Sequence, residues 1–168
     1  MVYNRFHTII HTNQLDRWQE YRDLRIRALR DIPQAFLDDP ENAENWPAEE
    51  WQKRMENMYF AEEEGKWVGM IGSYQEPKSK LQHIANVVSF FVLPESRGQG
   101  IGKALLSRVI EDAKKKKTIK KLQLGVVTTQ EFAQQLYLSL GFVKIGEQKY
   151  AVKVGEEYFD EYLMEMYL

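Results

Sequence analysis

Residues 92–106 read VLPESRGQGIGKALL, and this stretch carries most of the information about the fold. The almost continuous apolar run His83–Leu93 leads into it and predicts a central strand. The glycine-rich turn then opens a helix predicted over Gly98–Lys115. Glycines let a ligand come close to the backbone, and the first N–H groups of a helix have no intrahelical partner. Because the helix dipole adds positive potential there, the loop predicts an anion site of pyrophosphate size.

Other phosphate-binding loops have a different spacing. A Rossmann loop requires Gly-x-Gly-x-x-Gly, and a P-loop requires Gly-x-x-x-x-Gly-Lys followed by Ser or Thr. Here the glycines occupy positions 98, 100 and 102, and Ala104 follows Lys103, so both loops are disfavoured. The glycines alone could also serve only a tight turn. Arg97 and Lys103 add positive charge at this point, which favours the anion site.

The rest of the chain is interpreted from hydrophobic periodicity. Helices are predicted over Leu15–Asp31, Pro47–Asn57 and Gln130–Leu140, with a Pro/Asp/Asn-rich loop over Pro33–Pro47. Strands are predicted over Phe6–His11, Met58–Glu62, Lys66–Tyr74, Lys121–Val127 and Tyr158–Leu168. Strands in series, interrupted by two helices in the second half, indicate an α/β or α+β class with a mixed sheet.

The predicted helix Gln130–Leu140 has the clearest ends. Thr128 and Glu131 have the spacing of a capping box, and Gly141 suits the position just past the C-terminal end. Its apolar face includes Tyr137, so the spacing alone would make this tyrosine a core residue.

Composition indicates a soluble globular chain of one domain. It has 168 residues, 43% apolar and 29% charged, and its 23 basic and 25 acidic side chains give a net charge of −2. This balance offers no electrostatic case for nucleic acid, and no apolar run reaches the roughly 18 residues that span a membrane. The lack of cysteine excludes disulfides and thiolate ligands, and no metal site is expected. Because Met1–Thr12 shows no leader pattern, a cytoplasmic location is expected.

Two ordered motifs resemble a known family. The first is Arg97-x-x-Gly100-x-Gly102, just after Pro94-Glu95-Ser96, and the second is Gln130-x-x-Ala133-x-x-Leu136-Tyr137-x-x-x-Gly141-Phe142. Together they resemble the cofactor motifs of the GNAT superfamily, the acetyl-coenzyme A dependent N-acetyltransferases. The resemblance covers residues 86–142, and the ending Tyr162–Met166 is similar to the closing strand of many members.

The resemblance implies a single acetyltransferase domain over residues 1–168. Residues 1–57 would form a variable helical region on the acceptor side, 86–142 the coenzyme A core and 143–168 the closing strands. The fold would be a mixed, mostly antiparallel central sheet flanked by helices. The implied reaction moves an acetyl group from the co-substrate acetyl-CoA, without a metal, to a primary amine of a small molecule or peptide. It would proceed by direct attack in a ternary complex.

The family's cofactor-binding positions carry over to particular residues. Backbone groups of Phe91 and Val92 would pair with the pantetheine amides, and the loop N–H groups would take the pyrophosphate. Gln130 stands where the family commonly has asparagine, and its extra methylene departs from that pattern. The implied set is Phe91, Val92, Arg97, Gly98, Gln99, Gly100, Ile101, Gly102, Lys103, Gln130 and Tyr137.

For proton transfer, the resemblance points to Tyr137 as the acid that protonates the leaving thiolate. Some family members place a glutamate base on the central strand at the position of Asn86. An amide is no base, although Asn86 could hold a catalytic water, and His83 has the opposite strand parity. No residue is therefore identified as the base. The missing glutamate and Gln130 leave a second hypothesis open, a catalytically silent acyl-CoA sensor.

The acceptor is not identified by the sequence. Segments that usually flank it in the family contribute Arg22, Arg25, Trp46, Trp51 and Tyr158, and Asp160 interrupts the last strand. Each of these residues also has a structural explanation. The sequence leaves a homodimer and the use of longer acyl-CoAs open.

Overall fold

The structure is a computed structural model and describes residues 8–168. Within these residues one sheet is formed by β1 (Ile9–Thr12), β2 (Met58–Glu63), β3 (Lys66–Gln75), β4 (Ile84–Val92), β5 (Lys121–Val127), β6 (Val143–Val154) and β7 (Glu157–Tyr167). The strand order is β1-β2-β3-β4-β5-β7-β6, and each neighbouring pair is antiparallel except β4 with β5. The predicted mixed, mostly antiparallel sheet is confirmed.

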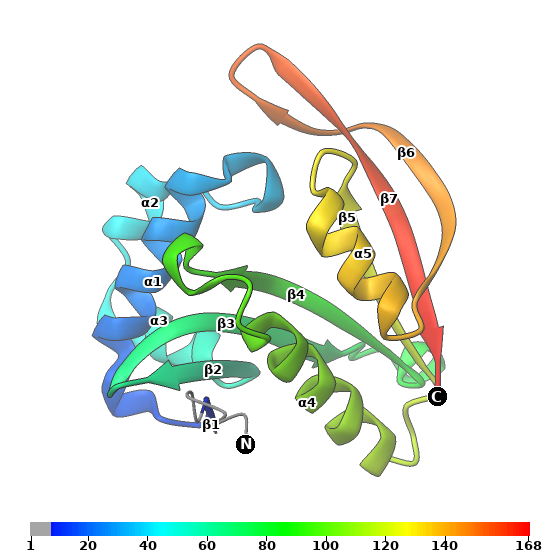
Figure 1. Ribbon diagram of the computed structural model, residues 1–168, viewed down its shortest axis with the longest axis horizontal. Helices are drawn as coiled ribbons and strands as arrows, with labels where there is room; N and C mark the ends of the chain where they lie inside the picture. Colours follow the sequence, from blue (N-terminus) through cyan, green and yellow to red (C-terminus); the bar gives the residue numbers. More distant parts are fainter. Residues whose placement is uncertain (1–7) are drawn as a thin grey trace, which may run out of the picture.

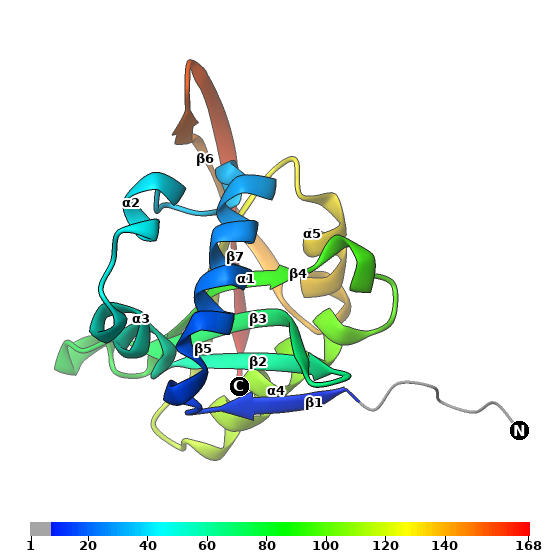
Figure 2. The same cartoon turned by 90° about the vertical axis from the view of Figure 1, so that its left-hand side faces the viewer.

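Helices cover both faces of the sheet (Figures 1 and 2). One face carries α1 (Trp18–Asp31), α2 (Pro40–Glu44) and α3 (Ala48–Met55), and the other carries α4 (Ile101–Lys115) and α5 (Glu131–Ser139). Short 3₁₀ turns lie at Leu15–Arg17, Pro33–Ala35, Ser79–Leu81 and Pro94–Ser96. Each face has its own buried apolar cluster, so the sheet is the middle of three layers.

Two local predictions were wrong. The expected loop Pro33–Pro47 contains α2, which starts at Pro40, where the fixed φ of proline suits a first helical turn. Thr128 does not cap α5, because the helix starts at Glu131 after Gln130 and no side chain bonds to its first N–H groups.

The helix expected from Gly98 begins at Ile101, because Gly98 and Gly100 have left-handed φ values. Several other element boundaries agree with expectation. The strand β5 and the β2–β3 hairpin lie where they were predicted, and Gly141 follows α5 with a φ of +102°. The first strand is Ile9–Thr12. The predicted start of that strand, with Phe6 and His7, lies outside the described residues.

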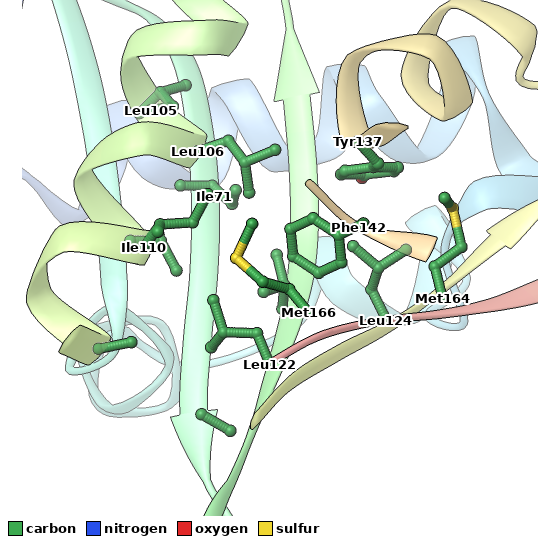
Figure 3. Close-up of a cluster of buried hydrophobic side chains, with 14 of the residues drawn as sticks. Ile71, Leu105, Leu106, Ile110, Leu122, Leu124, Tyr137, Phe142, Met164 and Met166 are labelled. Carbon is green, nitrogen blue, oxygen red and sulfur yellow. The ribbon is translucent and has the colours of Figure 1, made fainter. Parts of the chain in front are cut away.

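The core under α5 holds the helix in one position (Figure 3). Phe142 is 1% exposed, and its N–H donates to the Tyr137 carbonyl at 3.0 Å. The two rings meet edge to face with centroids 5.8 Å apart. Leu124 of β5 and Met164 of β7 belong to the same cluster. Because protein interiors are closely packed, this cluster restricts the Tyr137 ring to one place.

The strands β4 and β5 diverge soon after they pair (Figure 1). Their parallel register covers only Ile84–Asn86 with Lys121–Gln123. Further along, β4 carries a bulge against β3, and Ser89 in the bulge has a φ of +56°. A bulge bends its strand and ends regular pairing. The gap that opens between the two strands contains the site described next.

Candidate active site

A groove of about 540 Å³ runs beside the glycine loop and the start of α4. The predicted cofactor-binding residues that line it are Phe91, Val92, Arg97, Gly98, Gly100, Ile101, Gly102, Lys103 and Gln130. Tyr137 lines an adjoining cavity instead, and Gln99 lines neither hollow. The structure thus brings nearly the whole predicted set together around one groove.

The glycine loop presents unpaired N–H groups to this groove. Gly98 and Gly100 have φ values of +75° and +85°, which favour glycine. A Cβ on either would meet nothing within 4 Å, so the conformation rather than the space requires glycine. The first backbone bond of α4 joins the Ala104 N–H to the Gly100 carbonyl at 3.0 Å. The N–H groups of residues 101–103 therefore have no carbonyl partner inside the helix, as in an anion site.

Arg97 is tied to the end of β4. Its Nε donates to the Val92 carbonyl at 2.9 Å, while its terminal guanidinium nitrogens bond to no other residue of the range 8–168 and can bind an anion. The Leu93 N–H donates to Val68 of β3 at 2.9 Å, and neighbouring residues of a strand point their backbone groups in opposite directions. The backbone groups of Phe90 and Val92 therefore face the gap, whereas those of Phe91 face β3. This corrects the expected pair, Phe91 and Val92.

A second cavity, of about 530 Å³, adjoins the groove. Both hollows are lined by Ile32, Phe90, Gln130 and Ala133, so they meet between the end of β4 and the start of α5. Gln130, at the position where the resemblance implied an asparagine, is at this junction. The cavity extends into the gap between β4 and β5.

Tyr137 lies in the wall of this cavity. Its side chain is 5% exposed, and its ring packs against Phe90 and Phe142 with centroids 5.9 and 5.8 Å away. Burial raises the pKa of the Tyr137 phenol well above its usual range. The phenol is therefore neutral at physiological pH and can donate a proton or a hydrogen bond into the cavity.

Asn86 is not brought to Tyr137. It lies where β4 and β5 are still paired and does not line the Tyr137 cavity. Its Nδ2 donates to Glu76 Oε1 at 2.7 Å, and its Oδ1 accepts from Gln123 at 2.8 Å. Each end of the amide bonds to a neighbouring side chain, and Asn86 lies outside the Tyr137 cavity. This corrects the expectation that Asn86 holds a water at the reaction centre.

Sequence reasoning missed Glu161 of β7, which lines the cavity together with Tyr137. Burial raises the pKa of the Glu161 carboxyl, and no hydrogen bond or ion pair joins this carboxyl to another residue in the range 8–168. The carboxyl lies against Gly125, directly where a side chain at that position would be. In the sequence the only signal was an acid within a closing strand, and its neighbour Asp160 was selected instead.

Arg25 forms a charged wall of the same cavity. It is 6% exposed, and its Nη atoms donate to Ser89 Oγ at 2.9 Å and to Asp38 Oδ2 at 2.8 Å. Its guanidinium carbon lies 4.7 Å from the centre of the Phe36 ring. Asp38 also accepts from Arg54 at 3.3 Å. The formal charges of the charged side chains that line the cavity, Arg25, Asp38 and Glu161, sum to −1.

Three predicted acceptor-side residues lie away from the cavity. Arg22 lines a separate surface hollow along α1. Trp51 is completely buried in the core under α1. Trp46 packs beneath the guanidinium of Arg54, whose carbon lies 3.8 Å from the ring centre. These residues shape the helical face of the sheet without reaching the cavity.

The predicted residues of the closing strand and His83 are also structural or exposed. Tyr158 is 55% exposed and packs edge to face on Tyr150. Asp160 accepts from the Tyr150 N–H and from Lys149, each at 2.9 Å, and so links β7 to β6 in their hairpin. His83 is exposed and lies just before β4.

Within residues 8–168, no three His, Asp or Glu side chains are grouped so that they could hold a metal ion. None of the helices in this part of the chain is both long enough and apolar enough to cross a membrane.

Known proteins share this architecture. A family model described as the acetyltransferase (GNAT) family matches residues 18–142, which include both motifs. A solved phosphinothricin acetyltransferase of the GNAT superfamily from Sinorhizobium meliloti, in complex with acetyl-CoA, has the same fold with a TM-score of 0.83. It is 17% identical, and the match covers 96% of this chain and 88% of that one.

Two curated relatives match over most of this chain. An uncharacterised N-acetyltransferase of Methanocaldococcus jannaschii is 32% identical over 157 residues, which is 90% of this chain and 66% of that protein. N-acetyltransferase 8 of Homo sapiens is 30% identical over 143 residues, 80% of this chain and 54% of that protein. The chain thus spans only about half to two thirds of the length of these relatives.

The sheet and the helices on its two faces form the fold of that solved GNAT acetyltransferase. The family model covers well over half of the chain. The chain belongs to the GNAT family of acetyltransferases, as its two motifs predicted.

Proposed function

We propose that this chain transfers the acetyl group of acetyl-CoA to a primary amine of a small molecule or peptide, by direct attack in a ternary complex. The observation that carries the proposal is the junction at Phe90 and Gln130, where the loop groove meets the Tyr137 cavity. One hollow suits a phosphate-bearing carrier, and the other leaves room for an acceptor beside a proton donor. Two substrates can therefore meet without a covalent enzyme intermediate.

The groove supplies the groups that acetyl-CoA needs. The N–H groups at the start of α4 suit its pyrophosphate, and Arg97 and Lys103 add charge that attracts phosphate. Backbone groups of Phe90 and Val92 face the gap and would pair with the pantetheine amides as an added strand does. The Val92 carbonyl accepts from Arg97 in the structure, so Arg97 would have to release it for this pairing.

The proposed reaction balances as follows. The neutral amine nitrogen attacks the thioester carbonyl carbon, a C–N bond forms, and the C–S bond breaks with its electron pair on sulfur. The thiolate takes the Tyr137 proton, and the resulting phenolate regains one from the nitrogen of the new amide. Burial raises the pKa of the coenzyme A thiol as it raises that of the phenol, so the apolar site keeps the difference between the two pKa values from growing.

The test is turnover with a panel of n-butylamine, phenethylamine, glycinamide and a short peptide with a free N-terminus. Coenzyme A thiol release is measured with a thiol reagent, and the acetylated amine by mass spectrometry. We expect amine-dependent thiol release matched by amide formation. Saturable acetyl-CoA binding with no amide from any amine would favour the silent sensor. Thiol release without amide would indicate thioester hydrolysis only.

A further inference from the structure

Glu161 is the unpaired charge of the acceptor cavity. The other charged side chains that line this cavity, Arg25 and Asp38, pair with each other at 2.8 Å. The Glu161 carboxyl is half-buried and has no such partner in the described part of the chain. An unpaired carboxylate in a partly dry site attracts a cation, and an aliphatic amine with a pKa of about 10.4 arrives mainly as an ammonium ion.

Gly125 makes room for this carboxyl. Within β5, a Cβ built on Gly125 would overlap the Glu161 Cδ and both of its oxygens. Gly125 has no left-handed φ, so its backbone does not require glycine. The missing side chain instead lets Glu161 reach from β7 across β5 to the gap beside β4. The position of Glu161 along β5 depends on the register of β7 with β5, in which Glu161 lies opposite Val127.

Glu161 also lines a second, smaller hollow, through which a proton can reach water. This hollow, of about 280 Å³, adjoins the cavity at Gly125 and is also lined by Asn86 and Gln123. The residues that line both this hollow and the acceptor cavity are Val87, Val88, Gly125 and Glu161. Glu161 is the single polar side chain among them. The Glu161 carboxyl can therefore take a proton in the acceptor cavity and pass it to water in the smaller hollow.

We propose that Glu161 is the general base that takes a proton from the acceptor's ammonium group before the amine attacks. This inference rests on the proposed function and names the base that the sequence left unassigned. The N–H bond of the ammonium breaks, its electron pair stays on nitrogen, and the proton joins a Glu161 oxygen. The neutral amine then attacks the thioester as described above. Glu161 returns its proton to water, so each turnover starts from the carboxylate.

The pH dependence follows from the groups that face Glu161. Across the two hollows these are Arg25, Asp38, Tyr137 and Glu165. Burial is the one resolved cause of the raised pKa of Glu161. With wild-type protein, kcat/KM for total amine should rise as Glu161 ionises, at a pH above that of an exposed glutamate. It should then stay level until the amine itself loses its proton, at about pH 10.4 for an aliphatic amine and about pH 8 for a peptide α-amino group.

The test compares Glu161→Gln and Gly125→Ala with the wild-type protein, using the panel amine that is acetylated fastest. Glu157→Gln is the matched control, because Glu157 lies on the same strand and is exposed. At pH 7, Glu161→Gln should lower kcat/KM by about 100-fold or more while acetyl-CoA binding is unchanged. Its kcat/KM should then climb about tenfold per pH unit toward the pKa of that amine, about 10.4 for an aliphatic amine and about 8 for a peptide α-amino group, because only the neutral amine reacts. Gly125→Ala keeps the charge but displaces it, and should cost at least about tenfold.

The outcomes separate the two proposals. A wild-type chain that acetylates no panel amine overturns the proposed function and this inference with it. If the wild type is active, a Glu161→Gln variant with the wild-type rate and pH profile removes Glu161 from the reaction. A loss of equal size at every pH would mean a structural role and also overturns the base. If Glu161→Gln does not fold, as judged by a lack of stabilisation by acetyl-CoA, Gly125→Ala is used instead. Its dependence of kcat/KM on pH is then compared with that of the wild type, and an unchanged rate and profile removes Glu161 from the reaction.

Discussion

The role of Tyr137 can be tested by removing a single oxygen. In Tyr137→Phe the ring keeps its contacts with Phe90 and Phe142, at centroid distances of 5.9 and 5.8 Å. In the described residues no hydrogen bond joins the buried phenol to another group, so its removal should change the free energy of unfolding by less than about 1 kcal/mol. A positioned acid contributes roughly 10²–10⁴ to the rate. The expected loss in kcat corresponds to about 3–5 kcal/mol of barrier.

The assay is single-turnover transfer with acetyl-CoA prebound, so that product release does not limit the observed rate. Calorimetry should show unchanged acetyl-CoA affinity, because Tyr137 lines the cavity and not the loop groove. Tyr74→Phe is the matched control, since Tyr74 lies on β3 away from both hollows and is 42% exposed. Because burial raises the pKa of Tyr137, the wild-type rate should show no loss from phenol ionisation below pH ~10. A Tyr137→Phe variant with unchanged single-turnover rate would refute the role.

Three further perturbations follow from the groove and the core. Arg97→Ala should weaken acetyl-CoA binding by about 1–3 kcal/mol, and calorimetry that finds equal affinity would show that Arg97 only braces Val92. Gly100→Val should abolish cofactor binding in a folded protein, because a branched residue is strained at φ +85° and its side chain projects at the helix start. Gly146→Val, at an open position in β6, is the control. Phe142→Ala should lower the free energy of unfolding by about 3–5 kcal/mol in a denaturant titration, and a loss below about 1 kcal/mol would mean that the core of Figure 3 does not hold α5.

The sequence alone was sufficient for the features that depend on local backbone chemistry. The loop at Gly98 and Gly100 needs left-handed φ values, and a helix start leaves N–H groups unpaired wherever it occurs. Gly141 and the apolar face of α5 likewise follow from nearby residues. The family, the fold class and most element boundaries were predictable for this reason. Errors occurred where a proline begins a short helix, as in α2, and where a capping box was assigned from spacing alone.

Only the tertiary structure decided which side chains meet at the reaction centre. The family resemblance implied a base at the position of Asn86, yet Asn86 lies where β4 and β5 are still paired and its amide bonds to Glu76 and Gln123. Glu161 reaches the cavity because β7 pairs with β5 in one register and Gly125 leaves space there. A shift of one residue would turn Glu161 to the other face of the sheet. The backbone preferences of a segment are local, whereas contact between distant strands depends on register, bulges and packing that no single segment encodes.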